Sequence, residues 1–283
     1  MAIAGRAGAS RASTFRYAFL ILPRDQRQEL DAVYDFCRAV DDAVDLAPTS
    51  DMARHDLLEW RHELDRIFRE HPTHPVGVRL AQVIRRYGLP REHFDELLLG
   101  VAMDIGSPRY QTFAELERYA YRVASTVGLL CLPIFGCTGP RAERYAIDRG
   151  LSLQLTNIIR DVQADAKRDR IYIPQEDLDR FKYTEKELLA SVYTPAFVDL
   201  MAFQCRRARD YHQRVSTELP DRRRLLAPEI MGHAYLALLD RIEASNYRLF
   251  DRPIRVPSLV KAAIALKDWI GAYVHPTPVS EPL

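Results

Sequence analysis

The sequence predicts an all-α protein folded as a single domain of packed helices. Apolar residues recur at three- and four-residue steps along most of the chain, as at Leu30, Val33 and Cys37, which is the spacing of one helix face. Glycines and prolines separate these periodic stretches, as loops between helices require. No set of alternating apolar and polar runs indicates a sheet. These observations together predict about ten helices.

Individual helices are predicted from periodicity and from their start signals. The first clear one covers residues 30–44, where apolar side chains repeat with helical spacing. Two later helices are marked by Thr112 with Glu115 and by Thr184 with Glu187, both of which match a capping box. In that motif the hydroxyl and the carboxylate satisfy backbone N–H groups that the first helical turn leaves unpaired.

We expect one domain over residues 1–283, since no low-complexity linker divides the chain. Its ends, 1–12 and 274–283, are expected to be flexible. The most apolar stretch, 123–137, is interrupted by Pro133 and is shorter than the roughly 20 residues of a membrane-spanning helix. With no apolar signal peptide at the start, we expect a cytoplasmic protein without a transmembrane segment. Peripheral contact with a membrane and the oligomeric state stay open.

The charge balance excludes one large class of partners. The chain has 40 basic and 39 acidic side chains and a net charge of +1, so no global field favours nucleic acid. Any site for an anion must therefore be local. The four cysteines show neither zinc-site spacing nor a dense disulfide framework, which favours reduced thiols.

The segment DFCRAVDDAVD places two carboxylates on one face of a predicted helix. Asp41 and Asp45 are one turn apart, and the same face carries Tyr34 and Arg38. Apolar residues flank this polar stripe, which predicts that the helix is mostly buried. A buried stripe of this kind needs a partner that satisfies its polar groups.

A second segment, LQLTNIIRDVQAD, repeats the arrangement. Gln154, Asn157, Asp161 and Asp165 follow helical spacing along one face, and leucine, isoleucine and valine cover much of the rest of the helix. The sequence thus predicts two helices that each present an acidic stripe within an apolar surround.

Divalent cations are the partners that suit these stripes. Two carboxylates in contact at about 4 Å repel by about 4 kcal/mol at an effective dielectric constant of about 20, so the stripes are hard to bury without cations. Carboxylate and amide oxygens suit Mg²⁺, which completes its shell with water and phosphate oxygens. Nearby cationic side chains suit the same phosphate. They are Arg38, Arg160, Lys167, Arg168 and Arg170.

The alternative interpretation is a pair of solvated helix faces. A single DxxxD pair is more often a surface feature that forms ordinary ion pairs. Two such segments, each with amides or arginine on the same face and apolar flanks, favour a site for metal and diphosphate instead.

An allylic diphosphate leaves a carbocation when it ionises, and the cation must be kept from water. We therefore expect an apolar, aromatic cavity beside the metal site. Aromatic candidates for its wall are Phe15, Tyr17, Phe19, Tyr119, Tyr121 and Phe135. Small residues that leave room are Ala124, Ser125 and Gly128. For about half of these positions ordinary core packing is the better explanation.

At this point the chain resembles the squalene/phytoene synthase family, from about residue 13 to about residue 252. Four segments match the family's signatures in order: STFRYAFLILP, VYDFCRAVDDAVD, YRVASTVG and LQLTNIIRDVQADAKRDRIYIP. The resemblance implies the all-α isoprenoid-synthase bundle around a central cavity, and a Mg²⁺-dependent prenyltransferase.

The resemblance also assigns roles to residues. The implied Mg²⁺ ligands are Asp41, Asp45, Asn157, Asp161 and Asp165. The implied catalytic residues are Tyr34, Arg38, Tyr119 and Arg160. The implied substrate-binding residues are Ser13, Thr14, Phe15, Phe19, Gln154, Arg170 and Tyr247.

The chain departs from many relatives at two places. The pair Ser13–Thr14 stands where many have two serines, which keeps a hydroxyl. Asp169 stands where many have glycine. This added carboxylate either weakens phosphate binding or pairs with Arg168.

Within the family, the stretch LMAFQCRRARDYHQRV, with LP and ALLDRIEAS after it, looks most like bacterial hopanoid-pathway presqualene diphosphate synthases. The implied reaction joins two farnesyl diphosphates to presqualene diphosphate and releases pyrophosphate. The alternatives are a full squalene synthase that uses NADPH, which we do not favour, and a dehydrosqualene or phytoene synthase. Outside enzymes, the alternative is a helical scaffold that binds Mg²⁺.

Overall fold

The computed structural model describes residues 18–19, 21–218 and 221–274. In this part of the chain every regular element is a helix, which confirms the predicted all-α fold. The helices are α2 (Arg24–Asp45), α3 (Ser50–Phe68), α4 (Pro75–Tyr87), α5 (Arg91–Ala102), α6 (Phe113–Ala120), the π-helix η1 (Tyr121–Ser125), α7 (Thr126–Cys131), α8 (Pro140–Ala166), α9 (Gln175–Arg180), α10 (Glu185–Leu189), α11 (Pro195–Glu218), α12 (Leu226–Ala244) and α13 (Ser258–Val274).

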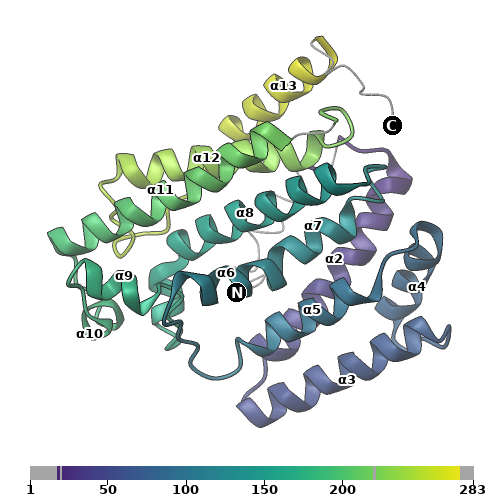
Figure 1. The fold of residues 1–283 in the computed structure, drawn as a ribbon, viewed down its shortest axis with the longest axis horizontal. Coiled ribbons are helices and arrows are strands. Elements are labelled where there is room, and N and C mark those ends of the chain that lie inside the picture. Colours follow the sequence, from purple (N-terminus) through teal and green to yellow (C-terminus); the bar gives the residue numbers. More distant parts are fainter. Residues whose placement is uncertain (1–17, 20, 219–220, 275–283) are drawn as a thin grey trace.

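Helix α8 occupies the middle of the molecule. It packs against α11 and α12 on one side and against η1 and α7 on the other, and Figure 1 shows these helices as neighbouring diagonal ribbons. Most of its side chains are buried around the whole circumference, as expected for a helix enclosed by others. Its C-terminal half carries the second acidic segment, so the fold places that segment in the interior.

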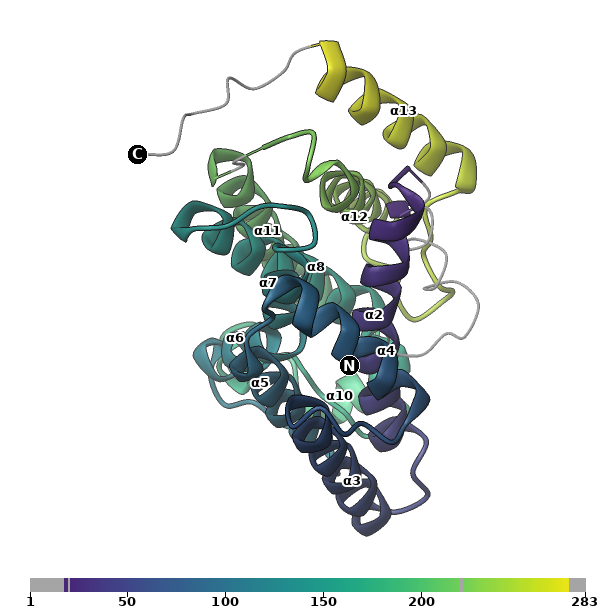
Figure 2. The ribbon, with the colours of Figure 1, turned by 90° about the vertical axis from the view of Figure 1, so that its right-hand side faces the viewer.

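Helix α2 carries the first acidic segment and lies beside α3, α4, α5 and α7. Its buried face is lined by aromatic and branched side chains such as Phe36, whose ring meets the rings of Trp60 and Phe94 edge to face. This packing holds the middle of the helix. Figure 2 shows α2 running along one edge of the molecule.

The two predicted capping boxes have different outcomes. At the start of α10 the box is complete, with Thr184 and Glu187 each accepting a backbone N–H of the other. At the start of α6, Thr112 accepts the Glu115 N–H, but the Glu115 carboxylate accepts the N–H of Gln111. The second prediction is therefore right about the helix start and wrong about one hydrogen bond.

The wide turn of η1 allows α8 to come very close. A Cβ at Gly150 would overlap Cα of Ser125 in η1, so only glycine permits this approach. The Ser125 hydroxyl donates to the carbonyl of Ile147, 2.8 Å away, and fastens the two helices. Among the described residues, no helix is both long enough and apolar enough to cross a membrane.

Candidate active site

Asp41, in the first acidic segment, is buried and lies in the last turns of α2. Burial, followed by the negative charges of Asp45 and Asp104, raises the pKa of this carboxyl to about 7. The three carboxyl groups are thus close enough to repel one another. A cation or a proton is needed to keep such a group stable in a buried site.

Tyr34 and Arg38 form the accessible end of the same stripe. The Arg38 side chain is 41% exposed, hydrogen bonds with Tyr34 and lies 3.4 Å from Asp42. An exposed guanidinium in this position is available to an anion from outside. The predicted stripe therefore exists, with its cationic end outermost and its carboxylates inside.

Asp45 links the two acidic segments. Its Oδ1 atom lies 2.6 Å from Nη1 of Arg170, and its Oδ2 atom lies 3.6 Å from Nη1 of Arg168. Both arginines follow α8, and their backbone N–H groups donate to the carbonyl of Asp165. The loop after α8 thus brings the end of α2 next to the end of α8, as the interpretation of a shared site requires.

The second segment lies on the buried C-terminal half of α8. Asn157 donates weakly to Gln154, with 3.4 Å between Nδ2 and Oε1, and its own Oδ1 atom is buried with no hydrogen-bond donor among the described residues. Asp161 accepts two hydrogen bonds from the neighbouring Arg160, at 2.7 and 3.0 Å. This fork holds the guanidinium beside the acidic stripe.

Sequence reasoning missed Asp104, which follows α5. This buried carboxylate accepts hydrogen bonds from the hydroxyls of Tyr119, at 2.9 Å, and Tyr172, at 2.6 Å. The rings of these tyrosines stack 5.2 Å apart, and Tyr110 lies against both. The available signal was a single aspartate inside the apolar run VAMDIG. Tyr119 is thereby fixed within an aromatic wall beside the carboxylates.

The predicted ligands offer carboxylate and amide oxygens, which suit Mg²⁺, although these side chains are not gathered around one point in the described part of the chain. Among the described residues no group of three or more histidine, cysteine, aspartate or glutamate side chains lies close enough to hold a metal ion. The Oδ1 atom of Asn157 and the Oδ2 atom of Asp45 are nevertheless buried, and no described residue hydrogen bonds to either oxygen. Such oxygens are the ligands that Mg²⁺ takes. Arg170 pairs with the other carboxylate oxygen of Asp45, and Arg160 pairs with Asp161.

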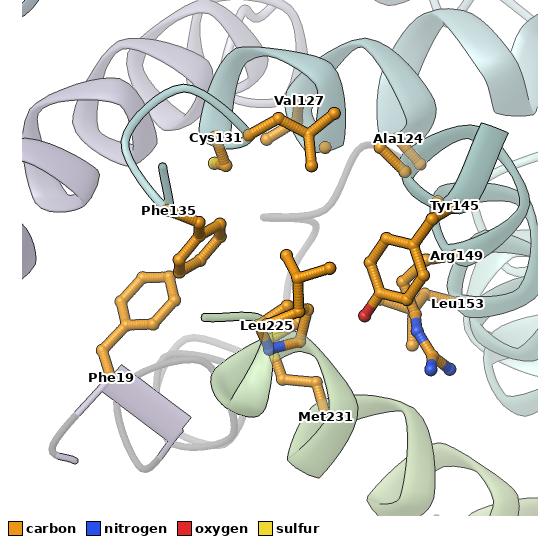
Figure 3. A pocket seen from close by; sticks show the side chains of 15 residues that line it. Phe19, Ala124, Val127, Cys131, Phe135, Tyr145, Arg149, Leu153, Leu225 and Met231 are labelled. Atoms are coloured by element: carbon orange, nitrogen blue, oxygen red, sulfur yellow. The ribbon is translucent and has the colours of Figure 1, made fainter. Parts of the chain in front are cut away.

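An apolar pocket of about 70 Å³ lies between η1, α7, α8 and α12. Figure 3 shows Phe19 and Phe135 on one side of it and Tyr145 and Arg149 on the opposite side. Four of the predicted wall residues line it: Phe19, Ala124, Gly128 and Phe135.

Other predicted wall residues have different surroundings. The Ser125 hydroxyl is directed to a backbone carbonyl, and Tyr119 belongs to the aromatic wall around Asp104. Tyr247, which was predicted to bind substrate, follows α12 and lies beside Cys205 and Glu243. No contact among the described residues joins it to the aspartates.

Asp169 is turned away from the phosphate clamp. Its carboxylate accepts hydrogen bonds from Ser107, at 2.5 Å, and from Arg109, at 2.6 Å. Of the two alternatives for Asp169, the pairing with Arg168 is therefore wrong. The residue has φ of 56°, a backbone conformation that glycine adopts most easily and aspartate tolerates. Three predicted substrate-binding residues, Ser13, Thr14 and Phe15, lie outside the described residues.

Comparison with known proteins shows which family the chain resembles. The model of the squalene/phytoene synthase family matches residues 9–260. A phytoene synthase of Arthrospira platensis is 36% identical over 270 residues, covering 89% of this chain and 87% of the relative. A phytoene synthase of Mycobacterium tuberculosis is 36% identical over 261 residues, covering 90% of this chain and 85% of the relative.

Solved structures resemble the chain over most of its length. A dehydrosqualene synthase crystallised with a ligand has a TM-score of 0.84 and 27% identity, with 93% of each chain covered. The squalene synthase HpnC from Alicyclobacillus acidocaldarius has a TM-score of 0.76 and 28% identity, covering 83% of this chain and 89% of the other. The expected helical fold of isoprenoid synthases is therefore confirmed.

Proposed function

This chain belongs to the squalene/phytoene synthase family, and on that premise we propose that it joins two prenyl diphosphates head to head and releases pyrophosphate. The observation that carries the proposal is the convergence of the two acidic segments at Asp45, through Arg168 and Arg170. These contacts bring a carboxylate of α2 and the cationic side chains that follow α8 together, which supports a site for diphosphate.

In this proposal Asp41, Asp45, Asn157, Asp161 and Asp165 hold Mg²⁺. When bound, Mg²⁺ neutralises the diphosphate and helps it to leave as pyrophosphate. Arg38 is exposed beside the carboxylates and binds a phosphate oxygen of the incoming substrate. Arg160 and Arg170, which pair with Asp161 and Asp45, would bind further phosphate oxygens of the substrate.

We assign the carbon chemistry to the apolar pocket that Phe19, Ala124 and Phe135 line. The C1–O bond of one donor breaks, and the allylic cation is attacked by the 2,3 double bond of the acceptor, which keeps its own diphosphate. Loss of one proton closes a cyclopropane. Tyr119 lies in the aromatic wall next to the carboxylates, and we assign to this wall the exclusion of water from the cation. The departing pyrophosphate accepts the proton, and Tyr34 or Tyr119 steers it.

Two product classes have specific support. The curated relatives at 36% identity are phytoene synthases, which favours C20 donors and a C40 product without added reductant. The structural likeness to a dehydrosqualene synthase and to HpnC favours C15 donors and a C30 product. Presqualene diphosphate, expected from the sequence, belongs to the second class.

A product assay separates these candidates. The purified chain is incubated with Mg²⁺ and either farnesyl or geranylgeranyl diphosphate, with and without NADPH. Phytoene from the C20 donor supports the first class, and presqualene diphosphate or a C30 hydrocarbon from the C15 donor supports the second. Squalene formed only with NADPH identifies a reductive second step. Absence of pyrophosphate release from either donor overturns the proposal and favours the scaffold.

A further inference from the structure

Helix α13 presents its apolar side to the outside of the molecule. Leu259, Leu266 and Ile270 are spaced at steps of seven and four residues, so they share one face, and they are 85%, 60% and 46% exposed. Trp269 and Tyr273 flank this face, with ring centroids 5.1 Å apart. Of the fifteen large exposed apolar side chains in the described residues, seven lie on this helix. Such a concentration marks an interaction surface.

The polar residues of α13 hold the helix in this orientation. Asp268 lies 2.7 Å from His233 of α12, and its side chain is largely buried. Nε of Arg223 donates to the carbonyl of Ala272, at 3.1 Å, and its guanidinium lies over the ring of Tyr273. Figure 2 shows α13 at the edge of the molecule, next to α12. The outward apolar face is therefore fixed by contacts on the inner face.

A pocket lined by arginines adjoins the start of α13. It has a volume of about 700 Å³ and is lined by Arg241, Arg248, Arg252 and Arg255, with Asp251 as its one acidic residue. Arg248 pairs with that aspartate at 3.4 Å. The other three arginines form no ion pair within the described part of the chain. A local excess of positive charge thus lies beside an exposed apolar helix.

We propose that the outer face of α13 and the arginine pocket form one surface that docks on a membrane rich in anionic phospholipid. Helices that lie in the membrane interface combine buried apolar side chains, aromatic residues at the headgroup level and basic residues that attract anionic lipids. Leu266 and Ile270 provide the apolar part, Trp269 the aromatic part and the arginine pocket the charge. Charge complementarity therefore selects an anionic lipid surface over a neutral one.

The surface adjoins the same end of α8 as the acidic segment. Lys261 of α13 lies near Arg160. Burial and the positive charge of Arg160 lower the pKa of the lysine. Gln163 of α8 donates to the carbonyl of Phe250, at 2.7 Å, and so holds the segment that leads to α13. Docking therefore brings the part of the candidate site that contains Arg160 near the lipid surface. The proposal goes beyond the reaction proposed above, and its test needs no turnover.

Sedimentation with vesicles tests the proposal on the full chain. Vesicles of phosphatidylcholine alone are compared with vesicles containing about 30% phosphatidylglycerol. We expect binding to the anionic vesicles only, weakening as salt rises from about 0.1 to about 0.5 M. Leu266→Glu with Ile270→Glu should weaken partitioning at least tenfold, because each buried leucine or isoleucine contributes about one tenfold step. Arg241→Gln with Arg252→Gln should remove the preference for anionic lipid.

The matched control is Leu58→Glu on α3, an equally accessible leucine on a distant helix, which should bind as the wild type does. Circular dichroism establishes that each variant is folded. Equal binding to neutral and anionic vesicles, or wild-type binding by the α13 variant, overturns the proposal. So does a wild-type dimer in sedimentation velocity that the α13 variant loses, since a second copy would then cover this face.

A fluorescence measurement keeps the test independent of the charged variants. The chain has two tryptophans, so Trp60→Phe leaves Trp269 as the only one. Its emission should shift to shorter wavelength with anionic vesicles, because the indole enters the lipid interface. Unchanged emission at saturating vesicles contradicts docking through α13.

Discussion

The guanidinium of Arg170 lies 2.6 Å from Oδ1 of Asp45, and both side chains are largely buried. This contact joins two segments that are far apart in the sequence, the end of α2 and the loop after α8. It holds the two segments together, because the arginine provides positive charge next to the buried carboxylate.

Removing one partner of this pair should destabilise the fold. Arg170→Gln should lower the free energy of unfolding by about 3 kcal/mol, because the buried Asp45 then keeps only the more distant and more exposed Arg168. Adding Asp45→Asn should recover much of the loss, which a double-mutant cycle with urea denaturation measures. Arg79→Gln, which breaks an exposed pair with Asp35, is the control and should cost at most about 1 kcal/mol. Equal losses in both variants would refute a buried role for Arg170.

Asp104 should matter for activity through Tyr119. Asp104→Asn replaces one carboxylate oxygen by an amide nitrogen, which donates and does not accept, so one of the two tyrosine hydroxyls loses its acceptor. We expect a loss of about 1–3 kcal/mol in stability and a fall in kcat. Tyr172→Phe should share the stability loss. Normal kcat in folded Asp104→Asn would exclude a positioning role for this carboxylate.

His212 should make stability depend on pH. Burial, then the charges of Arg149, Arg209 and His233, lower its pKa to about 3. Between about pH 6.5 and about pH 3 the unfolded chain binds a proton that the folded chain does not, so stability falls as the pH falls through this window. From about pH 7 to about pH 5 the wild type should lose about 2 kcal/mol more than His212→Asn. Parallel pH curves in urea denaturation would contradict this.

Gly232 of α12 makes room for a buried arginine. A Cβ there would overlap the guanidinium of Arg149, which pairs with Glu229 in the interior. Gly232→Ala should therefore lower the free energy of unfolding by about 2 kcal/mol or more, through overpacking around a buried charge pair. Gly271→Ala in α13 has space for the methyl group and should be neutral or stabilising by up to about 1 kcal/mol. Similar effects at both positions would contradict the packing argument.

The fold class was predictable because helical periodicity is a local property of the chain. The stretch around Leu30, Val33 and Cys37 forms α2, and the start of α10 has its complete capping box. The start of α6 shows the limit of such reasoning. There the Glu115 carboxylate reaches Gln111 instead of Thr112, a choice that loop geometry makes and the motif does not reveal.

The candidate site was predictable only where helical spacing defined it. The stripes of α2 and α8 needed spacing alone, so Asp41 and Asn157 were expected to be buried, as they are. Asp104 was missed because its importance depends on two tyrosine hydroxyls from distant segments. The partner of Asp169 could not be predicted for the same reason, since Arg109 lies sixty residues away in the sequence.

Pyrophosphate release as a function of Mg²⁺ tests the central claim most directly, the claim that carboxylates of α2 and α8 act as one site. We predict Mg²⁺-dependent release from farnesyl or geranylgeranyl diphosphate by the wild type and by Asp35→Ala, an exposed position of α2. We predict none above background from folded Asp41→Ala or Asp161→Ala. Release by the wild type in excess chelator, or at wild-type rates from both site variants, would contradict the account.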